Sequence, residues 1–345
     1  MAEADCCMSA EKNASLYAPW ITRQASDLLS QRGHAWLLQG PSGLGQYELA
    51  LALATAWLCE KPTPKGACGD CPSCHAIAVR THADLEVLMP ETVMIELGWP
   101  LSEKAQDEID KKTRKPSKEI RVDAMRDAVE FSQRTNARGR GKAVLVFPAE
   151  RMNTITANAL LKTLEEPPGD VRFVLATEAS HMLLPTIRSR CLAHTMKWPE
   201  PDEALVWLTQ QGVPGALAQD WLRSAGGRPA DVLRQAESGL SPDWWADLPK
   251  AMRRGDARYL ADLSPAQAID ALQKLCHDLV LRQSGAEPRF FETAQLPPCA
   301  ASVMVLTDWF KRMMQSARTA EHPFNAGLML EALTADAQQT LMSKG

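Results

Sequence analysis

The sequence lacks the features that would place the chain in a membrane or outside the cell. No apolar run approaches the ~18–20 residues that a membrane-spanning helix needs. The opening stretch, MAEADCCMSAEKNA, lacks the basic start and the apolar run of a secretory signal peptide. The charges nearly balance, with 38 Lys and Arg against 42 Asp and Glu, so no overall nucleic-acid-binding surface is indicated. We therefore expect a cytoplasmic protein without a membrane partner.

A disulfide framework is not indicated either, because nine cysteines is an odd number and a cytoplasmic chain keeps its thiols reduced. Four of the cysteines are clustered with the spacing C-x8-C-x2-C-x2-C, namely Cys59, Cys68, Cys71 and Cys74. Four thiolates form a closed, structural zinc site, whereas a catalytic zinc keeps one position open for water. The spacing predicts structural zinc. Free thiols, a redox-active C-x-x-C pair and an iron–sulfur cluster, which also uses four cysteines, are the alternatives.

The first half of the chain alternates short apolar runs with helical patterns. Predicted buried strands are residues 34–40 (HAWLLQG), 142–148 (KAVLVFP) and 171–177 (VRFVLAT). Residues 46–59 and 157–166 carry apolar side chains at helical spacing, and Pro167 and Pro168 end the second helix. Near-continuous apolar strands that alternate with helices predict an α/β domain, with a parallel sheet covered on both faces.

The stretch GPSGLGQY, residues 40–47, is similar to a phosphate-binding loop between a strand and a helix. The usual pattern, G-x-x-x-x-G-K-[ST], needs a lysine for the phosphate charge and a hydroxyl for Mg²⁺. Gly40 and Gly45 hold the glycine positions, but Gln46 replaces the lysine and Tyr47 replaces the hydroxyl residue. The loop keeps its glycines and lacks its charged and metal-binding groups.

The acidic motif that would hold Mg²⁺ at the end of a neighbouring strand is missing as well. Phe147 and Pro148 occupy that end, and Glu150 follows two residues later. Two independent losses favour an inert site, so we expect no intrinsic ATP hydrolysis. The alternative is an active, divergent ATPase in which Gln46 and Glu150 replace the missing groups.

Residues 91–118 interrupt the alternation, with few apolar residues, many charges and the run DKKTRKP. We interpret them as a solvated, mobile insertion, and a basic contact for DNA is the alternative. After Cys191 only helical patterns and helix breakers remain. The predicted domains are an α/β P-loop domain over residues 1–194, a small helical domain over 195–240 and a larger helical domain over 241–345.

The stretch NALLKTLEEPPGDVRFVLAT, followed by LLPTIRSRC, resembles the AAA+ subunits of the bacterial sliding-clamp loader. The resemblance covers about residues 17–235. Two features of this chain are similar to one subunit within that family, which is expected to lack nucleotide binding. They are the cysteine cluster, called the zinc knuckle below (residues 59–74), and the P-loop without its lysine and hydroxyl residue (residues 40–47). The resemblance implies a P-loop domain, a small helical lid domain and an all-helical collar domain that joins the subunits into a ring.

The resemblance also implies roles for residues and partners. Ser189, Arg190 and Cys191 match a Ser-Arg-Cys motif, whose arginine acts in trans as an arginine finger on ATP held by a neighbouring motor subunit. The implied cofactor is structural zinc, with no functional ATP or Mg²⁺ in this chain. Implied partners are the gamma and tau motor subunits and the delta subunit, and, through the assembled complex, the sliding clamp and primer–template DNA. The competing hypotheses are an active ATPase of the clamp loader or of a helicase loader, and a redox or zinc-dependent DNA-binding module.

Overall fold

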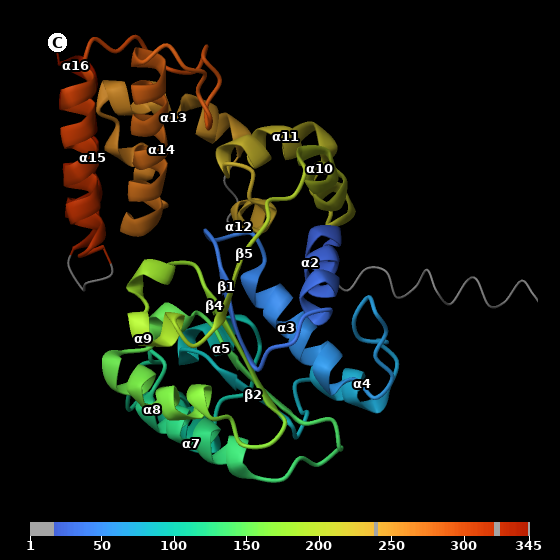
Figure 1. Ribbon diagram of the computed structural model, residues 1–345. Helices are drawn as coiled ribbons and strands as arrows, with labels where there is room; N and C mark the ends of the chain where they lie inside the picture. The colour runs from blue at the N-terminus through green and yellow to red at the C-terminus, as the bar shows by residue number, and fades with distance from the viewer. Residues whose placement is uncertain (1–16, 238–240, 321–324, 344–345) are drawn as a thin grey trace, which may run out of the picture. The chain divides into compact units, whose positions relative to one another are not determined.

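The computed structural model describes residues 17–237, 241–320 and 325–343 (Figure 1). The chain forms two compact units, Met1–Glu200 and Pro201–Gly345. Each unit buries apolar side chains of its own. Among the described residues, no helix combines the length and the apolar character that a bilayer-spanning segment requires.

The first unit is built on a five-stranded parallel sheet with the strand order β2-β3-β4-β1-β5. The strands are β1 (Ala35–Gln39), β2 (Leu85–Leu88), β3 (Lys142–Val146), β4 (Val171–Thr177) and β5 (Leu192–Thr195). The three central strands confirm the strands expected from the apolar runs, because only strands covered on both faces are apolar throughout. The edge strands β2 and β5 are short and were not predicted.

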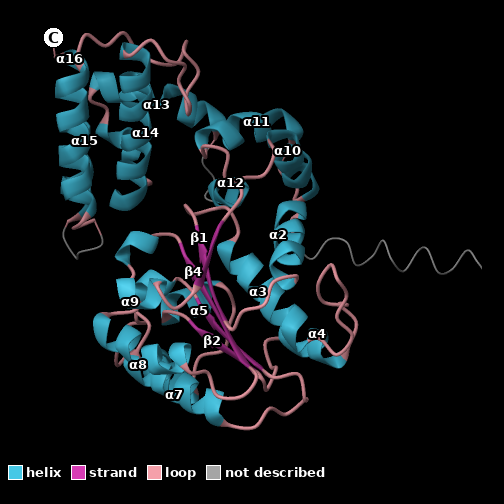
Figure 2. Cartoon of the chain, viewed as in Figure 1, coloured by secondary structure: helices cyan, strands magenta, loops and turns pink. Residues whose placement is uncertain are grey.

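Helices cover both faces of this sheet (Figure 2). On one face, α3 (Gln46–Leu58) lies against β3 and β4, and α2 (Pro19–Leu29) packs on α3. On the other face, α7 (Val122–Gln133) and α8 (Thr154–Glu165) pack together over Phe173 and Leu175 of β4. The parallel sheet between two helical layers is the α/β architecture that the sequence predicts, and α3 and α8 confirm the predicted helices within a few residues.

Residues 91–118 form helices, which their composition did not predict. They contain α5 (Glu91–Glu96) and α6 (Glu103–Asp110), and the Ser102 side chain caps α6. The guanidinium of Arg114 donates to Glu91 Oε1 at 2.7 Å and to Glu108 Oε2 at 2.6 Å. Glu91 is 7% exposed. The Arg114 ion pairs and the Ser102 cap, rather than a continuous apolar stripe, therefore help to hold this segment together.

Short elements complete the first unit: α4 (Pro72–Ala78), α9 (Pro185–Arg188) and the 3-10 turns η1 (Ala149–Arg151) and η2 (Ser180–Met182). Of these, η1 and η2 follow β3 and β4, two strands that the sequence had located. The short elements place the residues of the predicted sites, as described below.

The second unit is helical throughout its described residues. Its elements are α10 (Pro201–Gln210), α11 (Gly215–Ser224), α12 (Pro229–Glu237), α13 (Pro242–Arg254), η3 (Ala257–Leu260), α14 (Pro265–Gln283), α15 (Val303–Ala317) and α16 (Ala326–Met342). One buried cluster joins α10, α11 and α12, and a second, centred on Trp309 and Leu272, joins α13 to α16. The three predicted domains, with boundaries after residues 194 and 240, stay a prediction.

Candidate functional site

The side chain of Gln46 occupies the loop between β1 and α3. Its Nε2 donates to the carbonyl oxygen of Gly40 at 2.8 Å and to that of Pro41 at 2.6 Å. Gln46 is 2% exposed. A lysine at this position of a working loop extends its charge toward the phosphates, whereas this amide turns back onto the loop itself. The loop satisfies its own carbonyl groups without a ligand.

Tyr47 is also directed inward. Its hydroxyl accepts a hydrogen bond from Trp99 Nε1 at 2.7 Å, and its ring lies 5.5 Å from the ring of Phe147, measured between centroids. The Arg80 guanidinium lies over the Trp99 ring, 5.4 Å from the ring centroid. Burial raises the pKa of Tyr47. The residue that replaces the Mg²⁺-binding hydroxyl thus anchors the 91–118 segment.

Gly40 and Gly45, the two glycines of the P-loop pattern, each lie where a side chain would meet a neighbouring residue. Gly45 precedes α3 with a φ of 94°, a left-handed conformation that favours glycine. A Cβ on Gly45 would lie 2.7 Å from Ile21 Cδ1, and one on Gly40 would lie 2.9 Å from Met196 Cβ. The loop keeps its backbone shape through contacts with its own unit.

Glu150 does not point into the loop as a substitute metal ligand. One carboxylate oxygen accepts from Thr177 Oγ1 at 2.7 Å, and the other accepts from the backbone N–H of Glu178 at 3.1 Å. Both oxygens therefore bind the end of β4. The alternative of a divergent ATPase needs Gln46 and Glu150 to replace the missing groups. Neither side chain is arranged for that role, because both bind groups of this chain.

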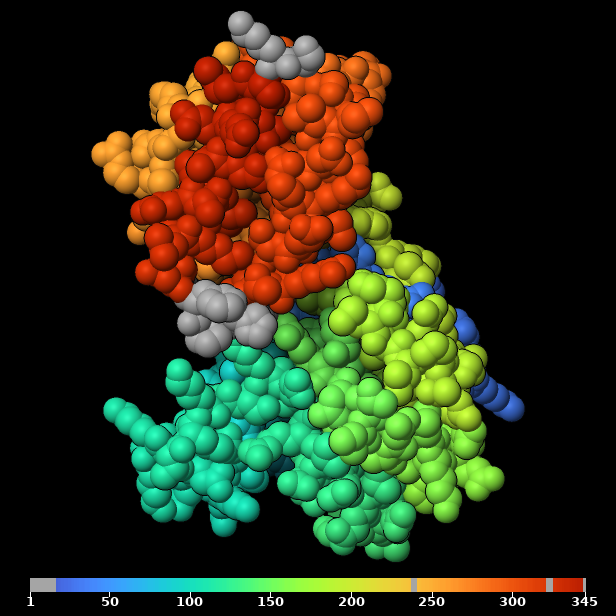
Figure 3. Space-filling model, turned by 90° about the vertical axis from the view of Figure 1, so that its left-hand side faces the viewer, coloured from blue at the N-terminus to red at the C-terminus, as the bar shows by residue number. Residues whose placement is uncertain are grey.

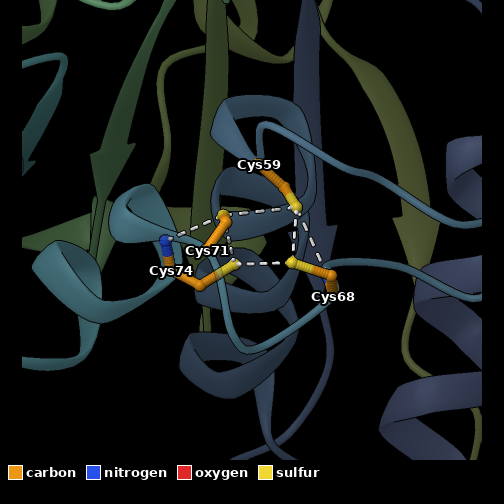
Figure 4. Close-up of side chains that lie close together, drawn as sticks. All are labelled: Cys59, Cys68, Cys71 and Cys74. Carbon is orange, nitrogen blue, oxygen red and sulfur yellow. Dashed lines mark hydrogen bonds between the residues drawn. The ribbon is translucent and has the colours of Figure 1, made fainter.

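The four clustered cysteines converge on one point (Figure 4). Cys59 follows the last residue of α3, Cys71 caps α4, and Cys74 lies in its first turn. Sγ–Sγ distances are 3.5 Å for Cys59–Cys68, 3.8 Å for Cys59–Cys71, 4.0 Å for Cys68–Cys74 and 3.4 Å for Cys71–Cys74. All four are free cysteines. The structure therefore brings together the whole predicted ligand set.

This geometry fits a tetrahedral metal ion. Zinc–sulfur bonds of about 2.3 Å place the sulfur atoms of a tetrahedron about 3.8 Å apart, and the measured separations lie on both sides of that value. Backbone N–H groups of Cys68 and Cys74 donate to Cys59 Sγ and Cys71 Sγ. Burial opposes ionisation of Cys71, but hydrogen bonds from Cys74 and Glu60 lower its pKa to about 6, which favours the thiolate that a metal needs.

A polar contact joins the cysteine cluster to the segment that precedes β3. Glu60 Oε1 accepts from Ser73 Oγ at 3.1 Å and from Arg138 at 3.0 Å. Glu60 and Ser73 are chain neighbours of two of the cysteines, and Arg138 precedes β3. The zinc knuckle is therefore attached to the α/β domain at two places, the end of α3 and the contact between Glu60 and Arg138.

Arg190 follows α9, two residues before β5. Its Nε donates to Glu165 Oε1 at 2.8 Å, one terminal nitrogen donates to the same oxygen, and the other donates to the Thr186 carbonyl oxygen at 2.8 Å. The Arg190 side chain is 28% exposed. Its motif neighbours have different surroundings: Ser189 is exposed, whereas burial raises the pKa of Cys191 to about 12. Of the three motif residues, Arg190 is the one that carries a charged side chain.

Comparison with known proteins supplies the family. DNA polymerase III subunit delta' of Pseudomonas aeruginosa is 37% identical over 231 residues, which cover 66% of this chain and 63% of that protein. The Escherichia coli protein of the same name is 34% identical over 212 residues, or 60% of this chain and 56% of that protein. The family model described as DNA polymerase III, delta subunit matches residues 22–200, more than half of the chain. The chain belongs to the DNA polymerase III delta-prime family.

Membership in the delta-prime family confirms the resemblance that the sequence motifs indicated. The matched regions span about three fifths of the length of the two delta-prime relatives. DNA polymerase III subunit tau of Escherichia coli is similar over a shorter region, with 34% identity over 178 residues, or 51% of this chain and 24% of that protein. A solved gamma subunit-related protein of Thermotoga maritima aligns with 92% of this chain and 99% of its own, at 18% identity and a TM-score of 0.48.

The loop, the cysteines and Arg190 were located from the sequence. The residues that contact the loop and Arg190 in the folded chain were not. Trp99, Arg80 and Glu165 were not predicted as site residues. Trp99 lies 52 residues from Tyr47 in the chain, and Glu165 lies 25 residues from Arg190. The tryptophan was the one available signal, because a large aromatic side chain is unusual in a solvated insertion.

Proposed function

We propose that the chain is a non-ATPase subunit of the DNA polymerase III clamp-loader complex, which helps to load the sliding clamp onto primed DNA. In this proposal it supplies Arg190 in trans to the ATP site of a neighbouring motor subunit. The observation that carries the proposal is the state of its own P-loop, where Gln46 and Tyr47 both bind protein groups instead of pointing toward a nucleotide. Family membership supports the assignment to the complex.

The missing groups explain why this chain would not turn over ATP. Phosphoryl transfer needs positive charge at the β- and γ-phosphates and a Mg²⁺ held by a hydroxyl and a carboxylate. Gln46 carries no charge, the Tyr47 hydroxyl accepts a hydrogen bond from Trp99, and both Glu150 oxygens bind the end of β4. No single substitution would restore this set, so the loss affects binding and chemistry together.

Arg190 suits a role in trans because its guanidinium is charged at all relevant pH values and binds phosphate oxygens in pairs. In the isolated chain the carboxylate of Glu165 accepts hydrogen bonds from that guanidinium. The pair is exposed, with side-chain exposures of 28% and 49%, so separating it costs little. A phosphate from a neighbouring subunit would exchange with Glu165 at small energetic cost.

The proposed partners follow from the family. They are the gamma and tau motor subunits and the delta subunit, with the sliding clamp and primer–template DNA bound through the assembled complex. The helices α13 to α16, which share one buried core, form the region that we assign to the ring-joining collar. Structural zinc bound by Cys59, Cys68, Cys71 and Cys74 is part of the proposal, supported by the separations of the four sulfur atoms.

The deciding experiment uses a reconstituted clamp loader with its motor subunits, clamp and primed DNA. Arg190→Ala in this chain is expected to lower clamp- and DNA-stimulated ATP turnover, because an arginine finger contributes roughly 10³–10⁵ in rate at the site it serves. Arg188→Ala, an exposed arginine on the preceding turn, is the matched control. Unchanged turnover by Arg190→Ala in an intact complex would show that the trans role is wrong.

A further inference from the structure

A cavity of about 490 Å³ lies beside the edge strand β2, in the first unit. Residues 86–89 of β2 and the segment after it form one wall, and α5, α6 and the start of α7 form the others. The helices that bound it belong to the teal surface at the lower left of Figure 3. Neither the degenerate P-loop nor the cysteine cluster contributes a residue to it, so it is separate from the sites described above.

The strand that borders this cavity has an unpaired edge. β2 is the last strand of the sheet on its side. The carbonyl oxygen of Leu88 accepts from the Phe147 N–H at 3.0 Å, so Leu88 directs its backbone groups toward β3. Backbone groups alternate along a strand, so Val87 directs its N–H and C=O the other way. In residues 17–237, which hold the whole sheet, no further strand pairs with Val87 on that side.

The charges around the cavity are unequal. Five acidic residues line it against three basic ones. Of the basic residues, Arg114 is bound by Glu91 and Glu108, Nη1 of Arg121 lies 3.6 Å from Glu91 Oε1, and Lys104 is an exposed side chain of α6. Glu86 and Asp127 have no ion pair among the described residues. Two carboxylates that take part in no ion pair within the described part of the chain therefore line the cavity beside the unpaired strand.

Glu86 shows the effect of that environment. Burial and the nearby Asp127 raise the pKa of Glu86 to about 7, and Lys142 only partly opposes them. Apolar side chains of Met89, Met94 and Leu101 line the cavity together with these carboxylates. Aliphatic walls that end in carboxylates match the side chain of lysine or arginine, which has an apolar stem and a cationic end.

We propose that this cavity receives an extended segment of a partner protein, whose backbone pairs with the edge of β2 and whose lysine or arginine side chain binds Glu86 and Asp127. The unpaired strand favours a polypeptide over a free amine, because strand addition uses the backbone groups of Val87 that an amine would leave unpaired. The carboxylates favour a basic side chain, because a cation would relieve the repulsion between them. This binding surface is additional to the proposed role of Arg190 and does not depend on it.

The test follows methyl signals of the full chain by nuclear magnetic resonance. Met89 and Met94 report on the cavity, and Met252 and Met313, which are buried in the core of the second unit, serve as control reporters. The probe is the capped peptide Thr-Val-Lys-Val-Thr. It is compared with versions that carry glutamate or norleucine instead of lysine, with a backbone N-methylated version, and with the diamine cadaverine. We expect saturable shifts of Met89 and Met94 with the lysine peptide alone, and at least about tenfold weaker binding of the others.

Two variants test the named carboxylates. Glu86→Gln and Asp127→Asn are each expected to weaken binding of the lysine peptide about tenfold, whereas Asp110→Asn, on an exposed acid of α6 outside the cavity, leaves it unchanged. Unmoved cavity methyls in the wild-type chain would overturn the proposal. So would equal binding of the glutamate peptide, or cadaverine binding as tightly as the peptide.

Discussion

The indole N–H of Trp99 donates a 2.7 Å hydrogen bond to the hydroxyl of Tyr47. Tyr47 stands where a working P-loop has its metal-binding hydroxyl, and Trp99 belongs to the charged segment of residues 91–118. The residue that replaces the usual hydroxyl of the P-loop pattern therefore also attaches this segment to the loop. Threonine or serine at position 47 has no group that extends as far as the tyrosine hydroxyl, so this contact is incompatible with the usual P-loop sequence.

The Tyr47–Trp99 contact is expected to stabilise the first unit. Tyr47→Phe leaves the buried indole N–H without its acceptor, at a cost of about 1–3 kcal/mol in the free energy of unfolding. A double-mutant cycle with Trp99→Phe, measured by denaturant titration, should give a coupling energy of roughly 0.5–1.5 kcal/mol. Coupling indistinguishable from zero would mean that the hydrogen bond contributes nothing net.

The isolated chain is expected not to bind ATP in a Mg²⁺-dependent way, because Gln46 and Tyr47 bind protein groups and Phe147 replaces the acidic motif. Isothermal titration calorimetry measures this directly. Gln46→Lys alone should not create Mg²⁺-dependent binding, since the metal ligands are still missing. Micromolar Mg²⁺-dependent affinity of the wild-type chain would contradict the non-ATPase assignment and favour a divergent motor subunit.

The cysteine cluster is expected to hold about one zinc per chain, measured by elemental analysis of the purified protein. Cys68→Ser should reduce the zinc content toward zero and lower the melting temperature, because the ion closes the segment between α3 and β2. Cys299→Ser, outside the cluster, is the control. Iron and acid-labile sulfide in place of zinc would instead identify an iron–sulfur site.

Glu165→Gln separates the two possible roles of the Arg190–Glu165 pair. Both side chains are partly exposed, so the free energy of unfolding should change by no more than about 1 kcal/mol. Stimulated ATP turnover of the reconstituted loader should stay within a few-fold of wild type, since Arg190 keeps its charge. A loss as large as that of Arg190→Ala would mean that Glu165 must position the guanidinium.

The raised pKa of Glu86 predicts that the free energy of unfolding depends on pH. Its pKa is raised from 4.5 to about 7, so between these values the folded chain binds more protons than the unfolded chain, and stability falls as pH rises. Glu86→Gln removes this penalty. The variant should be more stable than wild type at pH 8, by about 1–3 kcal/mol, and the difference should vanish below about pH 4.5. Chemical denaturation at several pH values measures it; a difference independent of pH would contradict the shifted pKa.

The outcome for each element shows where sequence patterns are sufficient. The central strands and α3 were predictable because near-continuous apolar runs require burial on both sides. The edge strands were not, since β5 exposes most of its side chains and β2 has only four residues. Helices α5 and α6 were also missed, because the Arg114 ion pairs and the Ser102 cap of α6 help to hold them, and neither leaves an apolar period in the sequence.

By itself, the sequence determined which chemical groups this protein lacks and which it places close together along the chain. The absent lysine, the absent acidic motif and the spacing of the cysteines are local facts, and they were enough to indicate the family. Only the tertiary structure decided what the replacement residues do. Gln46 turns back onto its loop, Tyr47 meets Trp99, and Arg190 meets Glu165. Contacts between residues far apart in the chain depend on how the helices and strands pack, and no local pattern specifies that packing.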